Sequence, residues 1–512
     1  MVVDGENMIM IDGENLTIND VISVSRNYAK AALSKKGRKK ILESRKNLEK
    51  IVSGGRVVYG INTGFGELCN VKIPQNKIEE LQKNLLRSHA VGVGMPLSEE
   101  IGRAALLLRA NTLSKGFSGV RIEVVEKLLG MLNKNVIPLI PEKGSVGASG
   151  DLAPLAHMAL TLIGEGEAFF NGERMKSKDA LKKAGIKPLK LESKEGLALI
   201  NGTSVMTAVL ALSVYDAEKL VKNSEIAGSM SLEALKGTDK AFDPEVMQVR
   251  KHKGQIDVAH NLRLLLKNSE IIKSHRNCQK IQDAYTLRCM PQVIGASKEV
   301  VDWVKKVVEI EINSATDNPL IFENESISSG NFHGQPIAFA ADFLGIAVSE
   351  IGDFSERRTA RMTDSKLSNL PPFLTKKSGL NSGFMTTQYT AAALASENKV
   401  LAHPASVDSI PTSANQEDHV SMGTIAARKA EEIIRNVEYI VAIEFICASQ
   451  GIEFHKPLKP GIGVQQAYKT IRKYVKKLDN DRIMYPEIEK IAELIRNGEI
   501  VRNVERRVGG LR

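Results

Sequence analysis

Residues 144–157 read GSVGASGDLAPLAH, a glycine-rich segment that passes directly into an apolar run. Its three glycines permit backbone conformations that are closed to other residues, so the chain can turn tightly here and other backbone can approach it. Asp151 is a favourable N-cap, Pro154 falls in the first helical turn, and residues 152–163 form an unbroken helix-forming run. The sequence therefore predicts that Ser149 lies just ahead of the positive end of a buried helix.

Three interpretations of Ser149 do not involve a prosthetic group. The spacing G-A-S-G differs from the G-x-S-x-G of a nucleophile elbow, and no strand-like run precedes it, which argues against a hydrolase. No Gly-Lys-Ser/Thr follows the glycines, which argues against a phosphate loop. A buried glycine-rich corner without chemistry is the structural alternative.

A fourth interpretation is covalent. If the turn brings the amide nitrogen of Gly150 onto the carbonyl carbon of Ala148, loss of two waters closes a five-membered ring and converts Ser149 into a dehydroalanine. The product is a methylidene-imidazolone, an electrophile that no ordinary side chain supplies. Such a ring needs glycine at its third position and small neighbours, and this segment has both.

The segment resembles the prosthetic-group segment of the aromatic amino acid ammonia-lyases, most closely that of their histidine-selective members, and further similarities extend along nearly the whole chain. The resemblance implies a 4-methylidene-imidazole-5-one formed from Ala148, Ser149 and Gly150, with no external cofactor. It implies non-oxidative elimination of ammonia from L-histidine to give trans-urocanate, by a homotetramer whose active sites are shared between subunits. The alternatives are a tyrosine or phenylalanine ammonia-lyase, a 2,3-aminomutase of the same family, or a non-catalytic helical scaffold without the ring.

Composition indicates a mainly α fold. The chain has 512 residues, 43% of them hydrophobic and 25% charged, and its long Ala/Leu/Glu/Lys/Ile stretches have a 3.6-residue period. We expect a large helical bundle with long central helices and a smaller, loop-rich N-terminal active-site region. One continuous structural unit is expected to comprise an N-terminal catalytic region (1–200), a central long-helix bundle (201–450) and C-terminal surface helices (451–512).

Charge and cysteine content exclude several classes of function. The net charge is +10, but basic residues are spread along the chain, aromatics are only 5%, and no nucleic-acid motif is present, so no nucleic-acid partner is expected. The four cysteines form no CxxC pair and have no metal-ligand spacing, which fits reduced thiols in the cytoplasm. No signal-peptide pattern and no bilayer-length apolar run occur, so neither export nor membrane insertion is expected.

Local signals predict several further elements. Thr17 and Asp20 form a helix-start signal before an amphipathic region. Residues 97–134 and 152–170 are predicted to be helical, and NGERMKS (171–177) is predicted to be a turn before a small exposed excursion.

Tyr59 stands at the entrance of a glycine-rich loop, VVYGINTGFGEL (57–68). A tyrosine there is ordinarily a half-buried loop aromatic. The resemblance implies instead the family's inner loop, in which the matching tyrosine is the base that removes the substrate's β-proton. That role requires nearby positive potential to lower the pKa of the phenol from its ordinary value of about 10.

Two segments carry residues that the resemblance assigns to substrate selection. A predicted helix ends with Ser88 and His89, where a histidine can simply complement the negative helix end. Histidine-selective members carry Ser-His at this pair, whereas tyrosine-selective ones carry His-Leu and phenylalanine-selective ones carry Phe-Leu. In the loop at 403–423, Glu417 matches a substrate-binding glutamate. Other acidic residues and His419 crowd beside it, but no metal-ligand spacing is recognisable, so no metal is expected.

The remaining predicted site residues lie in the middle of the chain. Asn201 precedes a break before an apolar helix; the resemblance places it near the imidazolone and the substrate carboxylate, with Ser204 where histidine-selective members usually have Gln. Phe332 matches a residue that presses on the imidazolone loop.

Gln282, Tyr285 and Arg288 have a spacing of three, which puts all three on one face of a helical backbone. By resemblance they form active-site wall, with Arg288 the bidentate partner of the substrate carboxylate. Met290 departs from the Gln more often seen at its position.

Overall fold

The computed structural model describes residues 8–53, 58–64, 66–276 and 280–512. The chain divides into two compact units, each assembled from three segments. Unit 1 comprises Met1–Leu212, Lys305–Asp342 and Pro404–Arg428, and unit 2 comprises Ser213–Val304, Phe343–His403 and Lys429–Arg512. The linear division into 1–200, 201–450 and 451–512 stays a prediction.

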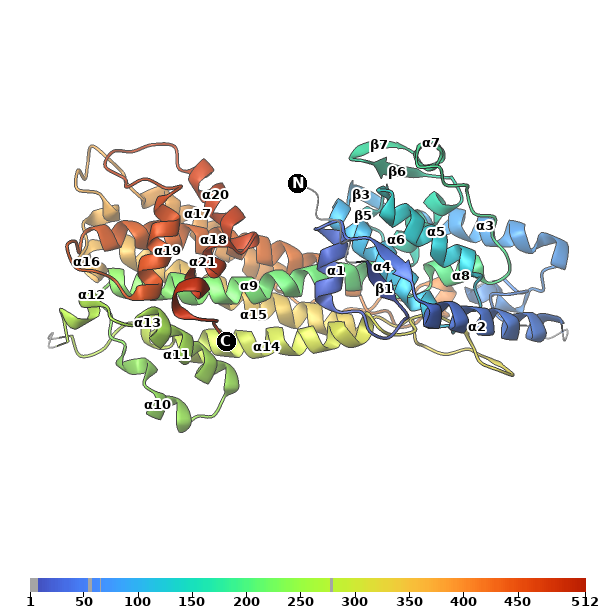
Figure 1. Cartoon of the computed structure of the whole chain (residues 1–512), viewed down its shortest axis with the longest axis horizontal. Coiled ribbons are helices and arrows are strands. Elements are labelled where there is room, and N and C mark those ends of the chain that lie inside the picture. The colour runs from blue at the N-terminus through green and yellow to red at the C-terminus, as the bar shows by residue number, and fades with distance from the viewer. Residues whose placement is uncertain (1–7, 54–57, 65, 277–279) are drawn as a thin grey trace. The chain divides into compact units, whose positions relative to one another are not determined.

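The fold is mainly helical with long helices, as the sequence predicts (Figure 1). The α-helices of unit 1 are α1 (Ile18–Ser25), α2 (Lys35–Ser53), α3 (Ile78–His89), α4 (Glu99–Ser114), α5 (Ile122–Asn133), α6 (Leu152–Leu162), α7 (Ser177–Lys183) and α8 (Glu195–Ile200). Those of unit 2 are α10 (Pro244–Gln248), α11 (Lys253–Leu265), α12 (Glu270–Lys273), α13 (Tyr285–Arg288), α16 (Ser365–Ser368), α17 (Met385–Leu401), α19 (Ile462–Arg472), α20 (Tyr485–Arg496) and α21 (Glu499–Val508).

Four of the five boundaries between the units fall within the four longest helices: α9 (Ser204–Ala234), α14 (Met290–Glu311), α15 (Gln335–Thr363) and α18 (Gly423–Glu453). Short 3₁₀ helices complete the helical elements: η1 (Gly66–Asn70), η2 (Gln75–Lys77), η3 (Lys240–Phe242), η4 (Pro372–Leu374) and η5 (Ser413–Asn415).

The strands are short and belong to unit 1: β1 (Ile9–Ile11), β2 (Ala31–Leu33), β3 (Val93–Pro96), β4 (Val136–Pro138), β5 (Pro141–Lys143), β6 (Glu167–Phe170), β7 (Glu173–Lys176), β8 (Leu320–Ile321) and β9 (Ser326–Ile327). β1 and β2 pair in parallel, β3 pairs antiparallel with β5, and β8 pairs antiparallel with β9. β4, β6 and β7 form a three-stranded antiparallel sheet beside α7 (Figure 1).

The sheet corrects one prediction from the sequence. Residues 152–170 are not helical throughout, because α6 ends at Leu162 and residues 167–170 form β6. Gly164 and Gly166 have φ values of 82° and 71°, which stop the helix. Asn171 and Gly172 turn the chain at φ 49° and 84°, as predicted, but residues 173–176 of the predicted turn segment form the second strand of a hairpin.

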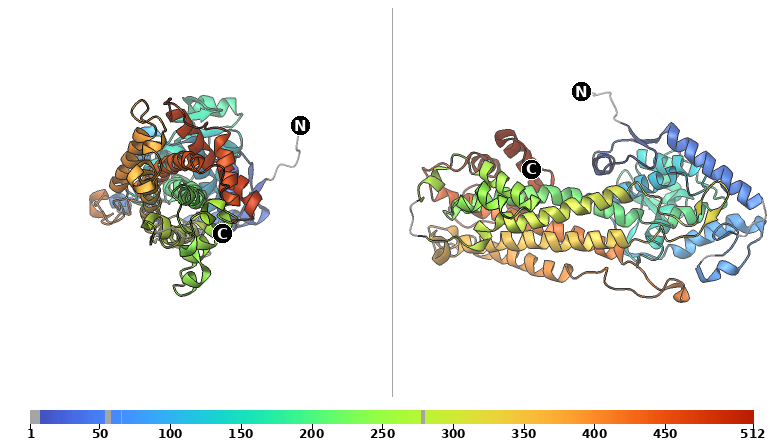
Figure 2. Two further views of the ribbon diagram at one scale, coloured as in Figure 1. Left: turned by 90° about the vertical axis from the view of Figure 1, so that its left-hand side faces the viewer. Right: turned by 90° about the horizontal axis from the view of Figure 1, so that it is seen from below.

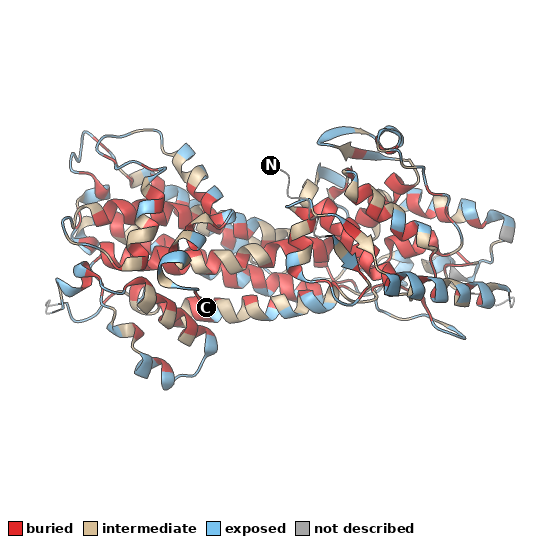
Figure 3. Cartoon of the chain, viewed as in Figure 1, coloured by how far each residue is buried: buried red, intermediate tan, exposed pale blue. Residues whose placement is uncertain are grey.

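The outer helices of unit 1 follow the sequence pattern. Thr17 and Asp20 form a complete capping box at the start of α1, as predicted. α2 lies on the outside of the unit (Figure 2), and its ribbon alternates between buried and exposed residues (Figure 3). Its buried residues include Ile41, Leu48 and Ile51, and most of its lysines are exposed.

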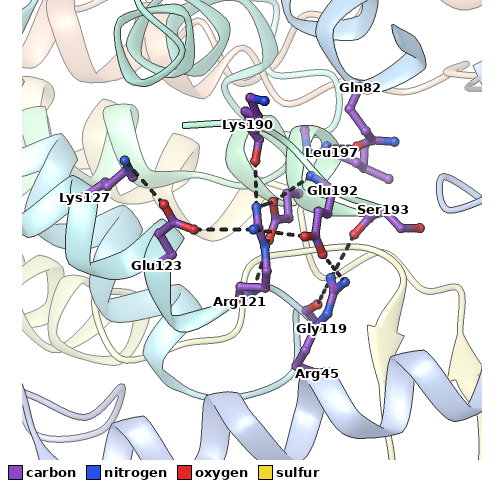
Figure 4. A network of polar contacts seen from close by, with 12 residues as sticks. Arg45, Gln82, Gly119, Arg121, Glu123, Lys127, Lys190, Glu192, Ser193 and Leu197 are labelled. Atoms are coloured by element: carbon purple, nitrogen blue, oxygen red, sulfur yellow. Dashed lines mark hydrogen bonds and ion pairs between the residues drawn. The ribbon is translucent and has the colours of Figure 1, made fainter. Parts of the chain in front are cut away.

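A polar network holds the chain where it enters α8, the helix that leads to Asn201 (Figure 4). The guanidinium of Arg121 binds both oxygens of buried Glu195, at 2.8 and 2.7 Å, and binds Glu192 at 3.0 Å. Arg45 binds the other oxygen of Glu192 at 2.6 Å. Bidentate pairing of this kind fixes geometry as well as charge, so the start of α8 is firmly placed.

Unit 2 contains a buried salt bridge between two of its long helices. Glu444 on α18 and Arg358 on α15 are both fully buried and form a salt bridge, and the hydroxyls of Ser231 and Ser355 each donate to Glu444 at 2.6 Å. A buried pair is tolerated only when its remaining polar atoms are largely hydrogen-bonded, and the two serines supply these bonds to the carboxylate.

Candidate active site

Ala148, Ser149 and Gly150 form a tight turn immediately before α6. Ser149 has a φ of 49° and Gly150 a φ of 80°, so two consecutive residues lie in the left-handed region, which is uncommon for serine. The Gly150 amide donates to the Gly147 carbonyl at 3.3 Å. Ala148 and Gly150 are buried, whereas Ser149 is partly exposed. The turn therefore presents the Ser149 side chain from an otherwise buried segment.

The turn packs directly on the backbone of Gly202. The Gly202 amide donates to the Ser149 carbonyl at 3.1 Å, and the Asp151 amide donates to the Gly202 carbonyl at 2.7 Å. A Cβ atom at Gly150 would lie 2.1 Å from the Gly202 oxygen, and one at Gly202 would lie 2.1 Å from the Thr316 oxygen. Only glycine fits at either position, because a side chain would meet fixed backbone.

The side chain of Asp151 caps a different helix from the one that the sequence predicts. It occupies the N-cap position of α6 but makes no capping hydrogen bond there, since its backbone (φ −100°, ψ 50°) is not extended. Its Oδ2 accepts from the amides of Val205 and Met206, at 2.8 and 2.9 Å, and so caps α9. Its Oδ1 accepts from the hydroxyl of Thr424 on α18 at 2.8 Å. One carboxylate thus joins the starts of three helices.

Buried charges surround this carboxylate. Burial raises the pKa of Asp151 to about 6, although the hydrogen bonds that it accepts act in the opposite direction. Burial also lowers the pKa of Arg109 on α4 to about 10, and the negative charges of Asp317 and Asp151 oppose that shift. The Nη1 atom of Arg109 donates to the carbonyl of Thr316 at 3.3 Å, on the segment that Gly202 contacts. A fixed cation therefore lies near the turn.

Asn201 is buried at the C-terminal end of α8, one residue before the Gly202 contact. Its Nδ2 donates to the Asn318 carbonyl at 3.4 Å, which fixes the orientation of the amide. Its Oδ1 has no hydrogen-bond partner among the described residues. A buried acceptor without a donor costs about 1–3 kcal/mol, so this atom marks a place where a ligand donor fits.

Tyr59 lies half-buried at the start of the loop that continues through η1; Val57 and Phe65, which the predicted loop includes, lie outside the described residues. The amide of Gly66 donates to the Tyr59 hydroxyl oxygen at 3.2 Å, a bond that favours the phenolate over the phenol. Gly66 has a φ of 54°, and a Cβ atom there would lie 2.6 Å from the hydroxyl oxygen of Ser413. The Tyr59 loop therefore contacts the loop that carries Glu417.

His89 is the last residue of α3, as predicted. Its Nδ1 bonds the Leu85 carbonyl at 2.9 Å and therefore carries a proton, while the Ser88 hydroxyl donates to the same carbonyl at 3.1 Å. Burial lowers the pKa of His89, and the nearby Glu417 carboxylate partly opposes this shift. The hydroxyl of Thr412 holds Glu417 by donating to its Oε2 at 2.7 Å. The Glu417 carboxylate is therefore close enough to act on the charge of the His89 imidazole, although the two residues are far apart in the sequence.

Phe332 lies half-buried in the turn before α15. Its neighbours Asn331 and His333 line a cavity of unit 1, together with Glu311 and Lys115.

Gln282, Tyr285 and Arg288 belong to unit 2 and lie together, but not on one helical face as the spacing predicts, because α13 begins at Tyr285 and Gln282 precedes it in non-helical chain. The Nη2 atom of Arg288 donates to the Gln282 side-chain oxygen at 3.1 Å, and its guanidinium lies 4.7 Å from the centre of the Tyr285 ring. Tyr285 is 69% exposed. Met290 is buried, and its sulfur leaves no room for a Cβ atom at Gly228. Unit 2 therefore presents a cation and a phenol on one surface.

A family model described as aromatic amino acid lyase matches residues 16–473. The chain belongs to the aromatic amino acid lyase family. It is 57% identical to the histidine ammonia-lyase of Alkaliphilus oremlandii over 98% of this chain and 99% of that relative. Among solved structures, a histidine ammonia-lyase from Trypanosoma cruzi is 43% identical with a TM-score of 0.91, covering 98% of this chain and 95% of that one. A tyrosine aminomutase from Streptomyces globisporus is 39% identical with a TM-score of 0.94, covering 98% and 100%.

Some residues of this aromatic amino acid lyase were not predicted as parts of the site. The sequence marks Gly202 as a break in a helix, but not as the glycine on which the Ser149 turn packs. Arg109 and Thr424 sit in regular helical runs, and no local signal distinguishes a buried arginine or threonine from a surface one. Asp151 has the residue type of a helix cap, so its partner on α9 is visible only in three dimensions.

The described residues of this aromatic amino acid lyase contain neither a metal-ligand cluster nor a membrane-spanning helix. No group of three or more His, Cys, Asp or Glu residues there has a geometry that could hold a metal ion. No helix in the described part of the chain combines the length and apolar character needed to span a membrane.

Proposed function

We propose that this lyase is a histidine ammonia-lyase. In the reaction, L-histidine loses a proton from Cβ and ammonia from Cα, and the product is trans-urocanate. The observation that carries the choice of substrate is the proximity of His89 and Glu417, because an imidazole offers two ring nitrogens that these polar groups can bind. The histidine ammonia-lyase of Caldanaerobacter subterraneus, 55% identical over 96% of this chain and 97% of the relative, supports the same choice.

The proposed electrophile is a methylidene-imidazolone made from Ala148, Ser149 and Gly150. The Gly150 nitrogen bonds to the Ala148 carbonyl carbon; that oxygen leaves as water with the amide hydrogens of Ser149 and Gly150. The second water takes the Ser149 hydroxyl and its Cα hydrogen. The left-handed backbone at Ser149 and Gly150, and the absence of room for a side chain at Gly150, fit this closure. When present, the ring supplies an electrophilic carbon that converts the substrate amine into a better leaving group.

The other groups of the chain have separate roles in this proposal. Tyr59 removes the β-proton, and the amide that donates to its oxygen favours the required phenolate. Arg288 binds the substrate carboxylate through its planar guanidinium. The resemblance assigns Asn201 to the substrate carboxylate, but its unpartnered Oδ1 is an acceptor and therefore suits the amine end of the substrate. Phe332 and Glu417 enclose the imidazole ring of the substrate.

We further propose a homotetramer with shared active sites, located in the cytoplasm. Large apolar side chains are exposed on unit 2, among them Ile281 at 95%, Trp303 at 42% and Phe343 at 47%. Exposed apolar groups of this size indicate a surface that another chain covers. Co-expression of Ser149→Ala with Arg288→Met tests the sharing of sites, because mixed assemblies regain activity only if these residues come from different subunits.

Turnover of L-histidine, L-tyrosine and L-phenylalanine by the purified protein tests the function. We expect urocanate and ammonia in equal amounts from L-histidine and little product from the other two. A β-amino acid product would support an aminomutase instead, and no product would support a non-catalytic scaffold.

Intact mass tests the prosthetic group. The wild type should be lighter than its sequence by two water molecules, and Ser149→Ala should have the unmodified mass and no activity while keeping its fold. Retention of a tenth of wild-type turnover by Ser149→Ala would contradict the imidazolone.

A further inference from the structure

Two histidines link the loops that carry Phe332 and Glu417. His333 directly follows Phe332, and His419 lies two residues after Glu417. The Nε2 atom of His333 lies 3.3 Å from the Nδ1 atom of His419, and the rings stack with centres 5.4 Å apart and an interplanar angle of 24°. The pair is therefore a direct contact between two loops that each bear a predicted substrate-binding residue.

A hydrogen bond defines the tautomer of a neutral His333. The amide of Gln335, the first residue of α15, donates to the Nδ1 atom of His333 at 3.3 Å, so this nitrogen is unprotonated. A neutral His333 consequently carries its proton on Nε2 and donates it to the Nδ1 atom of His419. The bonds thus run in one direction, from the N-terminus of α15 through His333 to His419.

Protonation would break this arrangement. Burial lowers the pKa of His333, and the neighbouring His419 lowers it further. The N-terminus of α15 also disfavours a cation at His333, because the helix end is itself positive. Lys115 and Glu311 line the same cavity as His333, and Glu417 and Asp418 precede His419 in its loop. A protonated His333 could no longer accept from Gln335.

We propose that the His333–His419 pair positions Phe332 and Glu417 around the substrate ring. This inference rests on the histidine ammonia-lyase function proposed above. Both histidines are positioning residues, since they act through the loops and not on the reacting atoms. Breaking the contact between the two histidines should weaken binding of the substrate ring more than it slows the chemical step.

Substitutions at His333 and His419 can remove the contact between the two rings while keeping the fold. His333→Asn keeps an acceptor for the Gln335 amide, but its shorter side chain has no N–H at the place of the His333 Nε2 atom that contacts His419. His419→Phe keeps the stacked ring but loses the acceptor. Each change should raise KM for L-histidine roughly five- to tenfold with a smaller effect on kcat, as expected for one lost hydrogen bond. The double variant should be no worse than either single variant, because both remove the same bond. His252→Asn, at an exposed histidine of unit 2, is the matched control and should change nothing.

The pH profile supplies a readout that a merely structural role would not move. In the wild type, kcat/KM should fall on the acid side as His333 becomes protonated, and His333→Asn should flatten that limb. Additive effects in the double variant, or an unchanged acid limb in His333→Asn, would overturn the proposal.

Wild-type activity separates this proposal from the proposed function. A wild type that does not turn over L-histidine contradicts the function, whereas an active wild type with unaffected variants contradicts only the role of the pair. Crystal structures of the wild type and His419→Phe decide that role without any assay. Displaced Phe332 and Glu417 loops would support positioning, and unchanged loops would overturn it.

Discussion

The oxygen of Tyr59 shows how a single residue is prepared for its proposed role. The Gly66 amide donates to it, and a donor to the oxygen stabilises the phenolate. The glycine that donates also approaches Ser413, so the loop that bears the base is in contact with the loop that bears Glu417. The position of the proposed base is therefore linked to that of the carboxylate that we propose binds the substrate ring.

Tyr59→Phe should lower kcat by about 10²–10⁴-fold with little change in KM, because a general base contributes about that much and the ring of the side chain remains. Steady-state kinetics on L-histidine measure this. Tyr485→Phe, at an exposed tyrosine at the start of α20, is the matched control. A near-normal kcat for Tyr59→Phe would move the role of base to Tyr285.

Glu417→Gln should reduce kcat/KM for L-histidine much more than it reduces stability, since Gln cannot offer the charge that an imidazole cation or N–H prefers. Combining it with His89→Leu should relax discrimination against phenylalanine and tyrosine, because unpaired polar groups in such a site reject an apolar ring by roughly 10⁴-fold. Relative kcat/KM values on the three amino acids measure the effect. Preference of the wild type for tyrosine would show that the substrate assignment is wrong.

At the scale of elements, Asp151 is the point where α6, α9 and α18 begin together. Its side chain satisfies two amides of α9 and one hydroxyl of α18, so these helices are joined through one buried group. The turn that bears Ser149 ends at Asp151. The joint that the Asp151 side chain forms between α9 and α18 therefore also supports this turn.

Asp151→Ala should destabilise the protein by about 2–4 kcal/mol, since it removes a helix cap and leaves buried donors unpaired. Asp20→Ala, which opens the solvent-exposed capping box of α1, is the control and should cost only about 1 kcal/mol. Urea unfolding measures both. Equal costs for the two substitutions would contradict the proposed joint.

The hairpin at 167–176 was only partly predictable from the local sequence. Asn171-Gly172, between EAFF and ERMK, is a strong signal for a two-residue hairpin, yet the apolar run before it favoured a longer helix. Ends of elements marked by side-chain capping, such as Thr17 with Asp20, were predictable. The partner of Asp151 was not, because residues 205 and 424 approach it only in the folded chain.

At the scale of the whole molecule, each compact unit combines three separate segments. The motif around Ser149 and the spacing of Gln282, Tyr285 and Arg288 were readable from the sequence, because each is local. The resemblance to the lyase family also assigns His89 and Glu417 to one substrate pocket. The pairing of His333 with His419 was not readable, since it depends on how distant segments meet.

Unit 2 also contains buried carboxyl groups that make stability depend on pH. Burial raises the pKa of Glu225 to about 8, and it raises those of Glu233 and Glu438 to about 7. A carboxyl group whose pKa is higher in the folded state binds its proton more tightly there. Its contribution to stability is therefore complete below the unfolded pKa, near 4.3, and is lost as the pH rises through the folded pKa.

Glu225→Gln should raise the melting temperature by a few degrees at pH 8 and change it little at pH 5, because Gln keeps an acceptor for Asn261 without a charge that must be buried. Calorimetry at the two pH values measures the difference. Glu43→Gln, at an exposed position of α2, should have no effect at either pH. Equal shifts at both pH values would show that burial of the Glu225 charge is not the cause.

The hydrogen bond between Asp151 and Thr424 can form only after the ribosome has synthesised residue 424. The two residues are 273 positions apart, so a ribosome adding about 5–20 residues per second makes the second roughly 14–55 s after the first. Throughout that interval the Ser149 turn lacks one of the helices that surround it. A nascent chain stalled before residue 424 should therefore retain the mass of an ordinary polypeptide, and the reactive group should appear only after release.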